Sequence, residues 1–127
     1  MAHRITNVSG ASSYFAGGVV SYSNDAKMAV LGVQPSTLES HGAVSEEVAG
    51  EMARGACTKF NTAYAISCTG IAGPTGGTNE KPVGLVYIGI AFPNSERVKK
   101  CMFRGDRKAV KQQTADQGFI MLMEELA

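Results

Sequence analysis

Residues 83–103 read VGLVYIGIAFPNSERVKKCMF, and this stretch decides the fold. Its first part, Val83–Phe92, is a continuous apolar and β-branched run, which is typical of a buried strand. The turn residues 93–95 follow, and Glu96–Phe103 alternates enough to pair back as the second strand of a hairpin. The stretch therefore predicts a buried strand with an antiparallel neighbour.

Further strands and helices are predicted on both sides of this hairpin. Ala63–Thr69 is a short apolar segment between turn residues and predicts a buried strand. Val19–Tyr22, a β-branched run after two glycines, predicts another strand. Helices are predicted at residues 2–8, from Ser23 or Asn24 to Leu31, from Pro35, from Ser45 to Phe60, and over 106–126. This order predicts a layered α/β domain with a mixed sheet, in which a parallel crossover comes first and the antiparallel hairpin last.

Length and composition limit the class of protein. The chain has 127 residues, which predicts one domain over 1–127. No apolar run approaches the ~18 residues of a membrane span, and the N-terminus lacks the apolar core of a signal peptide. The three cysteines have no CxxC spacing, which disfavours disulfides and zinc and favours a reducing cytoplasm. His3 and His41 lack neighbours at ligand spacing, so no metal is expected.

Charge is balanced overall but uneven along the chain. The net charge is +1, and seven of the twelve basic residues lie between Arg97 and Lys111. The simpler interpretation is a solvated strand edge and helix start; the alternative is attraction of an anionic, phosphate-bearing ligand. Aromatic residues for base stacking are almost absent from this stretch, so no nucleic-acid partner is expected.

The segment 70–84, GIAGPTGGTNEKPVG, is rich in glycine. It is neither a P-loop nor a GxGxxG motif. Such a loop exposes backbone N–H groups that can hold a phosphate or an oxyanion. The alternative is a purely structural loop without a ligand.

Two further groups of residues carry possible chemistry. Tyr22, Asn24 and Lys27 lie at a predicted strand-to-helix turn, where the helix dipole disfavours a cation, can lower the pKa of a lysine and so can make it a general base. The alternative is a capped helix start with a solvent-facing lysine. Asp106 and Arg107 begin the last helix, where an anion is favoured, and the alternative there is a plain cap.

Several motifs in order resemble the C-terminal domain of the competence/damage-inducible protein CinA. They are GGVVSYSNDAK (17–27), LGV (31–33), HGAVS (41–45), TGIAGPTGG (69–77) with EKPVG (80–84), and FRGDR (103–107). The resemblance covers about residue 1 to the C-terminus and implies a three-layer α/β/α sandwich with a mixed sheet.

This resemblance also implies an activity, that of a nicotinamide mononucleotide amidohydrolase. Such a hydrolase cleaves the carboxamide of nicotinamide mononucleotide and releases nicotinate mononucleotide and ammonia, a step of pyridine nucleotide (NAD) salvage. The resemblance further implies a cytoplasmic homo-oligomer with no cofactor, no metal and no membrane partner. A serine acts as nucleophile, Lys27 as its base, and Tyr22 assists. The implied substrate-binding residues are Asn24, Thr69, Gly70, Gly73, Thr75, Gly76 and Gly77, with Arg107 as a phosphate contact.

One departure from the family concerns the nucleophile. The family's serine lies in a Glu-Ser-Cys-Thr-Gly-Gly motif after the first strand, and this sequence has no such motif. The chain is therefore expected to be an N-terminally truncated form, lacking the family's first helix and strand, with little or no deamidase activity. The alternative function is a non-catalytic module that binds a nucleotide or a partner protein, linked to competence or the DNA damage response. An exposed strand edge and self-association are expected.

Overall fold

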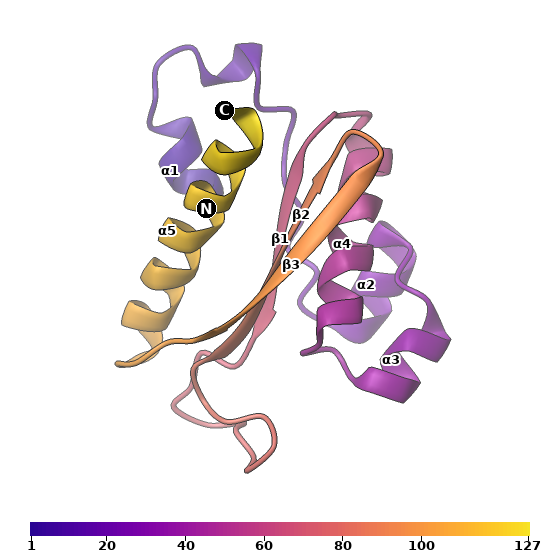
Figure 1. Cartoon of the computed structure of the whole chain (residues 1–127), viewed down its shortest axis with the longest axis vertical. Coiled ribbons are helices and arrows are strands. Elements are labelled where there is room, and N and C mark those ends of the chain that lie inside the picture. The colour runs from indigo at the N-terminus through magenta and orange to yellow at the C-terminus, as the bar shows by residue number, and fades with distance from the viewer.

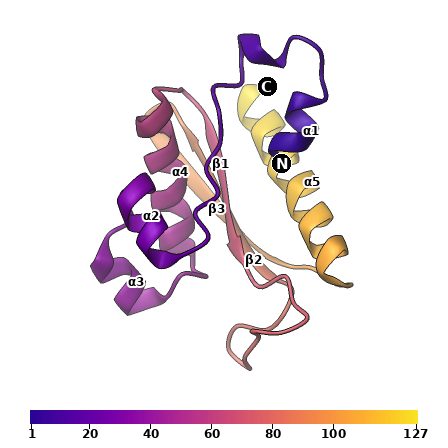
Figure 2. The same ribbon diagram turned by 180° about the vertical axis from the view of Figure 1, so that it is seen from behind.

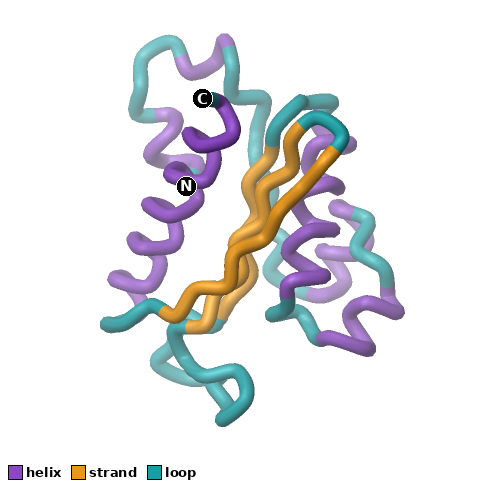
Figure 3. The backbone as a smooth tube through the Cα atoms, viewed as in Figure 1, coloured by secondary structure: helices purple, strands orange, loops and turns teal.

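The computed structural model describes residues 1–127, and its strands form one three-stranded sheet (Figures 1 and 3). The strand order is β1-β2-β3, and both pairs are antiparallel. The elements in chain order are α1 (Ala2–Thr6), the 3₁₀ turn η1 (Ala11–Ser13), α2 (Asn24–Leu31), α3 (Pro35–His41), α4 (Glu46–Phe60), β1 (Ala65–Gly70), β2 (Leu85–Phe92), β3 (Ser95–Met102) and α5 (Arg107–Leu126). Helices α5 and α1 lie on one side of the sheet, and α4, α2 and α3 lie on the other.

The hairpin predicted from residues 83–103 is confirmed. β2 pairs with β3 from Leu85↔Met102 to Phe92↔Ser95. Because β2 is central and covered on both faces, Ile88 and Ile90 are fully buried. The helix positions and the strand at Ala63–Thr69 also agree with the prediction to within a few residues. The turn η1 has no counterpart in the prediction.

Two apolar cores hold the layers together. One lies between the sheet and α5 and contains Ile88, Ile90, Val110 and Met121. The other lies between α2 and α4. Helix α4 approaches the sheet closely at Gly89, where an added Cβ would lie 2.6 Å from the carbonyl oxygen of Ala49. A fully packed α4–sheet contact therefore requires glycine at this position.

The mixed sheet predicted from the sequence is wrong, because Val19–Tyr22 is not a strand. Residues 16–22 form no backbone–backbone hydrogen bond, and Figure 2 shows the chain passing from η1 to α2 without joining the sheet. A β-branched run favours an extended backbone, but a strand also needs a neighbour to pair with, and β1 does not pair with this segment. Only Val19 packs against the α2–α4 core. The parallel crossover is accordingly absent, and the sheet is entirely antiparallel.

The helix starts follow the sequence signals. Ser23, Ser45 and Asp106 accept the backbone N–H three residues ahead at the starts of α2, α4 and α5. Pro35 opens α3. None of the helices combines the length and apolar character that crossing a bilayer requires.

Candidate functional site

Lys27 in the first half of α2 is a buried lysine without an acidic partner. The residue is 7% exposed, and its Nζ donates to the Ser21 carbonyl oxygen at 3.0 Å. It takes part in none of the salt bridges of the molecule. Burial lowers the pKa of the Lys27 amine below its ordinary value, because the charged form loses its water without gaining a counter-ion. This shift favours the neutral amine, which is the form that can accept a proton.

The backbone around Lys27 is well defined. The Ser23 hydroxyl accepts the Ala26 N–H at 3.0 Å and starts α2. Gly32, with φ +70°, ends the helix, and the Val33 N–H returns to the Lys27 carbonyl at 3.1 Å. Ser23 is therefore occupied as a helix cap.

The two other predicted residues of this group are open to solvent. Tyr22 is 83% exposed, and its hydroxyl makes no hydrogen bond within the chain. Asn24, the first residue of α2, is also exposed. Tyr22, Asn24 and Lys27 thus lie close together along the chain, but only Lys27 is enclosed.

Thr69 and Gly70 lie at the end of β1, where the glycine-rich loop begins. Thr69 is buried, and its hydroxyl donates to the Ala43 carbonyl oxygen at 2.7 Å, which ties β1 to the α3–α4 connection. A Cβ at Gly70 would lie 2.7 Å from the Leu85 carbonyl oxygen, so glycine lets the chain leave β1 close to β2.

The glycine-rich loop 71–84 is held from two sides. Arg107 at the start of α5 donates through Nη1 to the Gly73 carbonyl oxygen at 3.0 Å. On the other side, Lys81 Nζ donates to the His41 carbonyl oxygen at the end of α3, at 2.6 Å. Lys81 was not among the predicted site residues, although it lies in the EKPVG motif. These two cations position the loop between α3 and α5.

Several backbone N–H groups in the first half of this loop are unused. The N–H groups of residues 72, 73 and 75–77 form no hydrogen bond within the protein. Gly73 and Gly76 have φ of +82° and +93°, a region that side-chain-bearing residues rarely adopt, while Thr75, Gly76 and Gly77 are exposed. Consecutive free N–H groups in such a conformation can bind an anion.

The predicted site residues therefore form two groups. Tyr22, Asn24 and Lys27 lie at the start of α2, and the loop residues lie with Arg107 at the end of β1. No hydrogen bond joins the two groups. The buried lysine and the glycine-rich loop are consequently separate parts of the structure.

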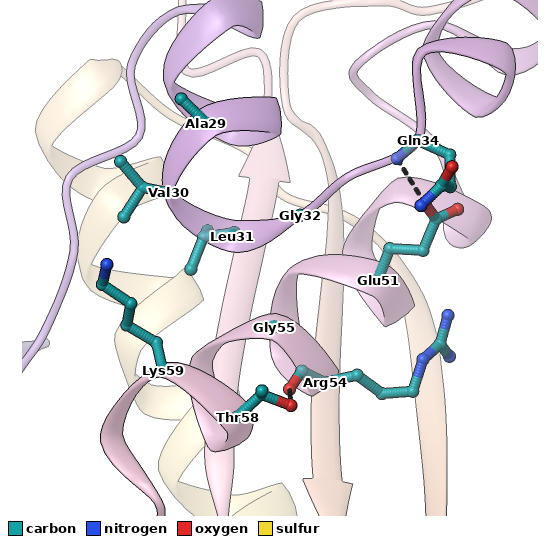
Figure 4. A pocket seen from close by; sticks show the side chains of 10 residues that line it. All are labelled: Ala29, Val30, Leu31, Gly32, Gln34, Glu51, Arg54, Gly55, Thr58 and Lys59. Atoms are coloured by element: carbon teal, nitrogen blue, oxygen red, sulfur yellow. Dashed lines mark hydrogen bonds between the residues drawn. The ribbon is translucent and has the colours of Figure 1, made fainter.

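A cavity lies elsewhere, beside the crossing of α2 and α4 (Figure 4). It measures about 750 Å³ and includes none of the predicted site residues. A Cβ at Gly55 would overlap the Leu31 carbonyl, so the two helices touch there and the cavity is the open groove along their contact. One of its polar groups, Glu51 Oε1, already accepts a hydrogen bond from the Gln34 backbone N–H at 2.8 Å. We therefore place the candidate site at Lys27 and the loop.

Not all basic side chains between Arg97 and Lys111 are free of acidic partners. Arg97 is paired with Glu124 and Glu125 on α5 at 2.5 and 2.6 Å. The other basic residues of the stretch are exposed and form no salt bridge; they are Lys99, Lys100, Arg104, Arg107, Lys108 and Lys111. These residues lie on β3, on the connection that follows it and at the start of α5.

Comparison with known proteins identifies close relatives along the whole chain. The chain is 49% identical over 126 residues to a CinA-like protein of Syntrophomonas wolfei, covering 99% of this chain and 30% of that protein. It is 50% identical over 115 residues to a CinA-like protein of Kosmotoga olearia, covering 91% and 28%. The chain thus spans less than a third of the length of these curated relatives.

Solved structures match the fold closely. The competence/damage inducible protein CihA from Agrobacterium tumefaciens superposes with a TM-score of 0.94 at 37% identity, covering 97% of this chain and 76% of that chain. The competence damage-inducible protein A from Klebsiella pneumoniae gives 0.94 at 32% identity, covering 98% and 78%. The CinA C-terminal domain profile matches residues 1–126. With this match, the motifs and the fold, the chain belongs to the CinA C-terminal domain family.

Proposed function

We propose that this chain binds nicotinamide mononucleotide at the α2 start and the glycine-rich loop, using parts of an amidohydrolase site. The reaction that this site serves is hydrolysis of the nicotinamide carboxamide to nicotinate mononucleotide and ammonia. The proposal rests on family membership and on the motifs that carry the resemblance. The observation that carries it is Lys27, a buried amine with a lowered pKa and no carboxylate partner.

Lys27 supplies the proton-accepting function. A serine–lysine pair is a recurring solution for acyl transfer, in which the neutral amine takes the proton of the serine hydroxyl. Burial lowers the pKa of Lys27, which favours the neutral amine that this role requires. Tyr22 is exposed at the same turn, where its hydroxyl can contact a bound ligand.

The loop supplies the anion-binding function. The free N–H groups of residues 72, 73 and 75–77 can donate hydrogen bonds to the 5′-phosphate or to the oxyanion that develops at the carboxamide. Arg107 places Gly73 and brings a positive charge to the same loop. A phosphate near Arg107 would share the guanidinium with the Gly73 carbonyl, because Arg has five donors.

The nucleophile is the part that this chain does not contain. The 127 residues include no Glu-Ser-Cys-Thr-Gly-Gly motif. Ser67 is buried on β1 and donates to the Ala49 carbonyl at 2.6 Å, so its hydroxyl is occupied. We accordingly propose binding with little or no turnover for the 127-residue chain.

Two measurements on the purified chain test this proposal. Calorimetry with nicotinamide mononucleotide should show binding, and Arg107→Met should weaken that binding, while Lys100→Met on β3 serves as a matched control. An ammonia assay should show little or no release. Ammonia release that Lys27→Ala abolishes would contradict the expected inactivity, and an absence of binding would contradict the ligand site.

The second candidate is a non-catalytic module that binds another nucleotide or a partner protein. The missing nucleophile motif favours this candidate over a complete enzyme. It predicts that nicotinamide mononucleotide has no advantage over adenosine monophosphate in the same calorimetry. A role in DNA uptake would instead require salt-dependent binding to duplex DNA, which the free cations of β3 and α5 make testable.

A further inference from the structure

Three consecutive backbone carbonyls at the end of α3 accept hydrogen bonds from three different parts of the molecule. These carbonyls belong to residues 41–43, and each accepts from a side chain. The hydrogen bonds are Lys81 Nζ to His41, Ser45 Oγ to Gly42 and Thr69 Oγ1 to Ala43, at 2.6, 2.8 and 2.7 Å. The donors come from the glycine-rich loop, the start of α4 and the end of β1. Residues 41–43 are therefore a common attachment point for the loop and for the strand from which the loop begins.

The Lys81 ammonium suits the end of α3 chemically and sterically. His41 is the last residue of α3, so its carbonyl oxygen lacks a partner within the helix. A cation is favoured at a helix C-terminus, and a hydrogen bond from an ammonium is charge-assisted. Gly42 has φ +76°, and a Cβ there would lie 3.0 Å from Lys81 Nζ. Glycine at this position thus leaves room for the ammonium against the backbone of α3.

The loop transmits the position of Lys81 to its first half. The Thr78 N–H donates to the Lys81 carbonyl oxygen at 2.8 Å, and the Lys81 N–H donates to Thr78 Oγ1 at 3.0 Å, which closes a turn. Just beyond this turn, Val83 contacts the opposite half of the loop. A Cβ at Gly73 would lie 2.5 Å from Val83 Cγ1, and one at Gly77 would lie 2.7 Å from the Val83 nitrogen. The two halves of the loop touch, so they move together.

We propose that Lys81 is a positioning residue of the nucleotide site: by tying the loop to the end of α3, it sets the position of the free N–H groups. These groups belong to residues 72, 73 and 75–77. Arg107 holds the first half of the loop at the Gly73 carbonyl, and Lys81 holds the returning half. An untied loop would have to be ordered by its ligand, which costs affinity. This inference rests on the proposed function, because it assigns Lys81 a role in that site.

Hydrogen exchange of the full chain without nucleotide tests the tie between the loop and α3. Lys81→Met removes the donor and keeps most of the side chain. It should speed exchange of the Thr78 N–H, and of the Gly42 N–H that donates to the Leu38 carbonyl, by about fivefold or more. Lys81→Arg keeps a charged donor and should leave both amides close to the wild-type rate. Lys100→Met removes an exposed charge on β3 and should change neither amide.

Calorimetry with nicotinamide mononucleotide on the same variants separates a positioning role from a merely structural one. Lys81→Met should weaken binding by about fivefold, because the ligand must then order the loop, while the midpoint of urea unfolding stays at the wild-type value. Lys81→Arg should restore most of the affinity, and Lys100→Met should bind like the wild type. A merely structural role would lower the urea midpoint of Lys81→Met and leave the affinity of the folded protein unchanged, which would overturn the inference.

Other results that contradict the inference come from comparing exchange with binding. Unchanged exchange of Thr78 and Gly42 in Lys81→Met would show that the loop is held without this tie. Weaker binding with unchanged exchange would show that Lys81 contacts the ligand directly and does not act through the loop. Fast exchange in Lys81→Arg would show that a charged donor is not what holds the loop. If the wild type binds no nicotinamide mononucleotide, the proposed function fails, and exchange still decides whether Lys81 positions the loop.

Discussion

Replacing Lys27 by methionine removes a buried charge while keeping most of the side chain. The Lys27 ammonium has one acceptor within the protein, the Ser21 carbonyl at 3.0 Å, and no salt bridge. Burying an ammonium costs several kcal/mol, and a hydrogen bond from a charged group returns about 1.5–3 kcal/mol. We therefore expect Lys27→Met to be more stable than the wild type at pH 7, by about 1–2 kcal/mol.

The difference should also depend on pH in a defined direction. The pKa of Lys27 is lowered in the folded protein and lies near 10.4 in the unfolded chain. Between these two values the unfolded state binds more protons, so wild-type stability rises with pH. The contribution of Lys27 is fully present above the unfolded pKa and is lost as the pH falls through the folded pKa. The advantage of Lys27→Met should thus shrink as the pH rises from 7 to 10.

Urea unfolding at several pH values measures this difference directly. Lys100→Met is the matched control, because Lys100 is exposed and forms no salt bridge. The difference in the free energy of unfolding between Lys100→Met and the wild type should stay small and independent of pH. The reasoning is refuted if the stability difference between Lys27→Met and the wild type does not change with pH, or if the wild type loses stability relative to the variant as the pH rises.

Three further substitutions test the packing, the helix start and the loop. Gly89→Ala should destabilise the fold by about 2 kcal/mol or more, because its Cβ would meet the Ala49 backbone at 2.6 Å; thermal unfolding at the wild-type temperature would disprove this close contact. Asp106→Ala should cost about 1 kcal/mol through loss of the α5 cap, measured by urea unfolding, and Asp106→Asn should recover most of it. Arg107→Met should speed hydrogen exchange in residues 71–84 several-fold by releasing the Gly73 carbonyl; unchanged exchange would show that the loop is held without it.

The local signals in this sequence predicted the elements well. The caps Ser23, Ser45 and Asp106 marked helix starts because each side chain satisfies a backbone N–H within its own turn. The hairpin of residues 83–103 was predictable for the same reason, since its strands are adjacent in sequence. The burial of Lys27 was not predictable, because it depends on neighbours that the fold brings from elsewhere.

The sequence was sufficient for the helices, the hairpin and the family motifs, because these depend on residues within a few positions of each other. Only the tertiary structure decided that Val19–Tyr22 remains unpaired, since a strand exists through hydrogen bonds to a neighbour and no neighbour is present in this chain. It likewise decided that Arg107 and Lys81 hold the glycine-rich loop, through contacts with Gly73 and His41 that span 34 and 40 residues. Such contacts depend on the packing of distant segments, which short-range patterns do not encode.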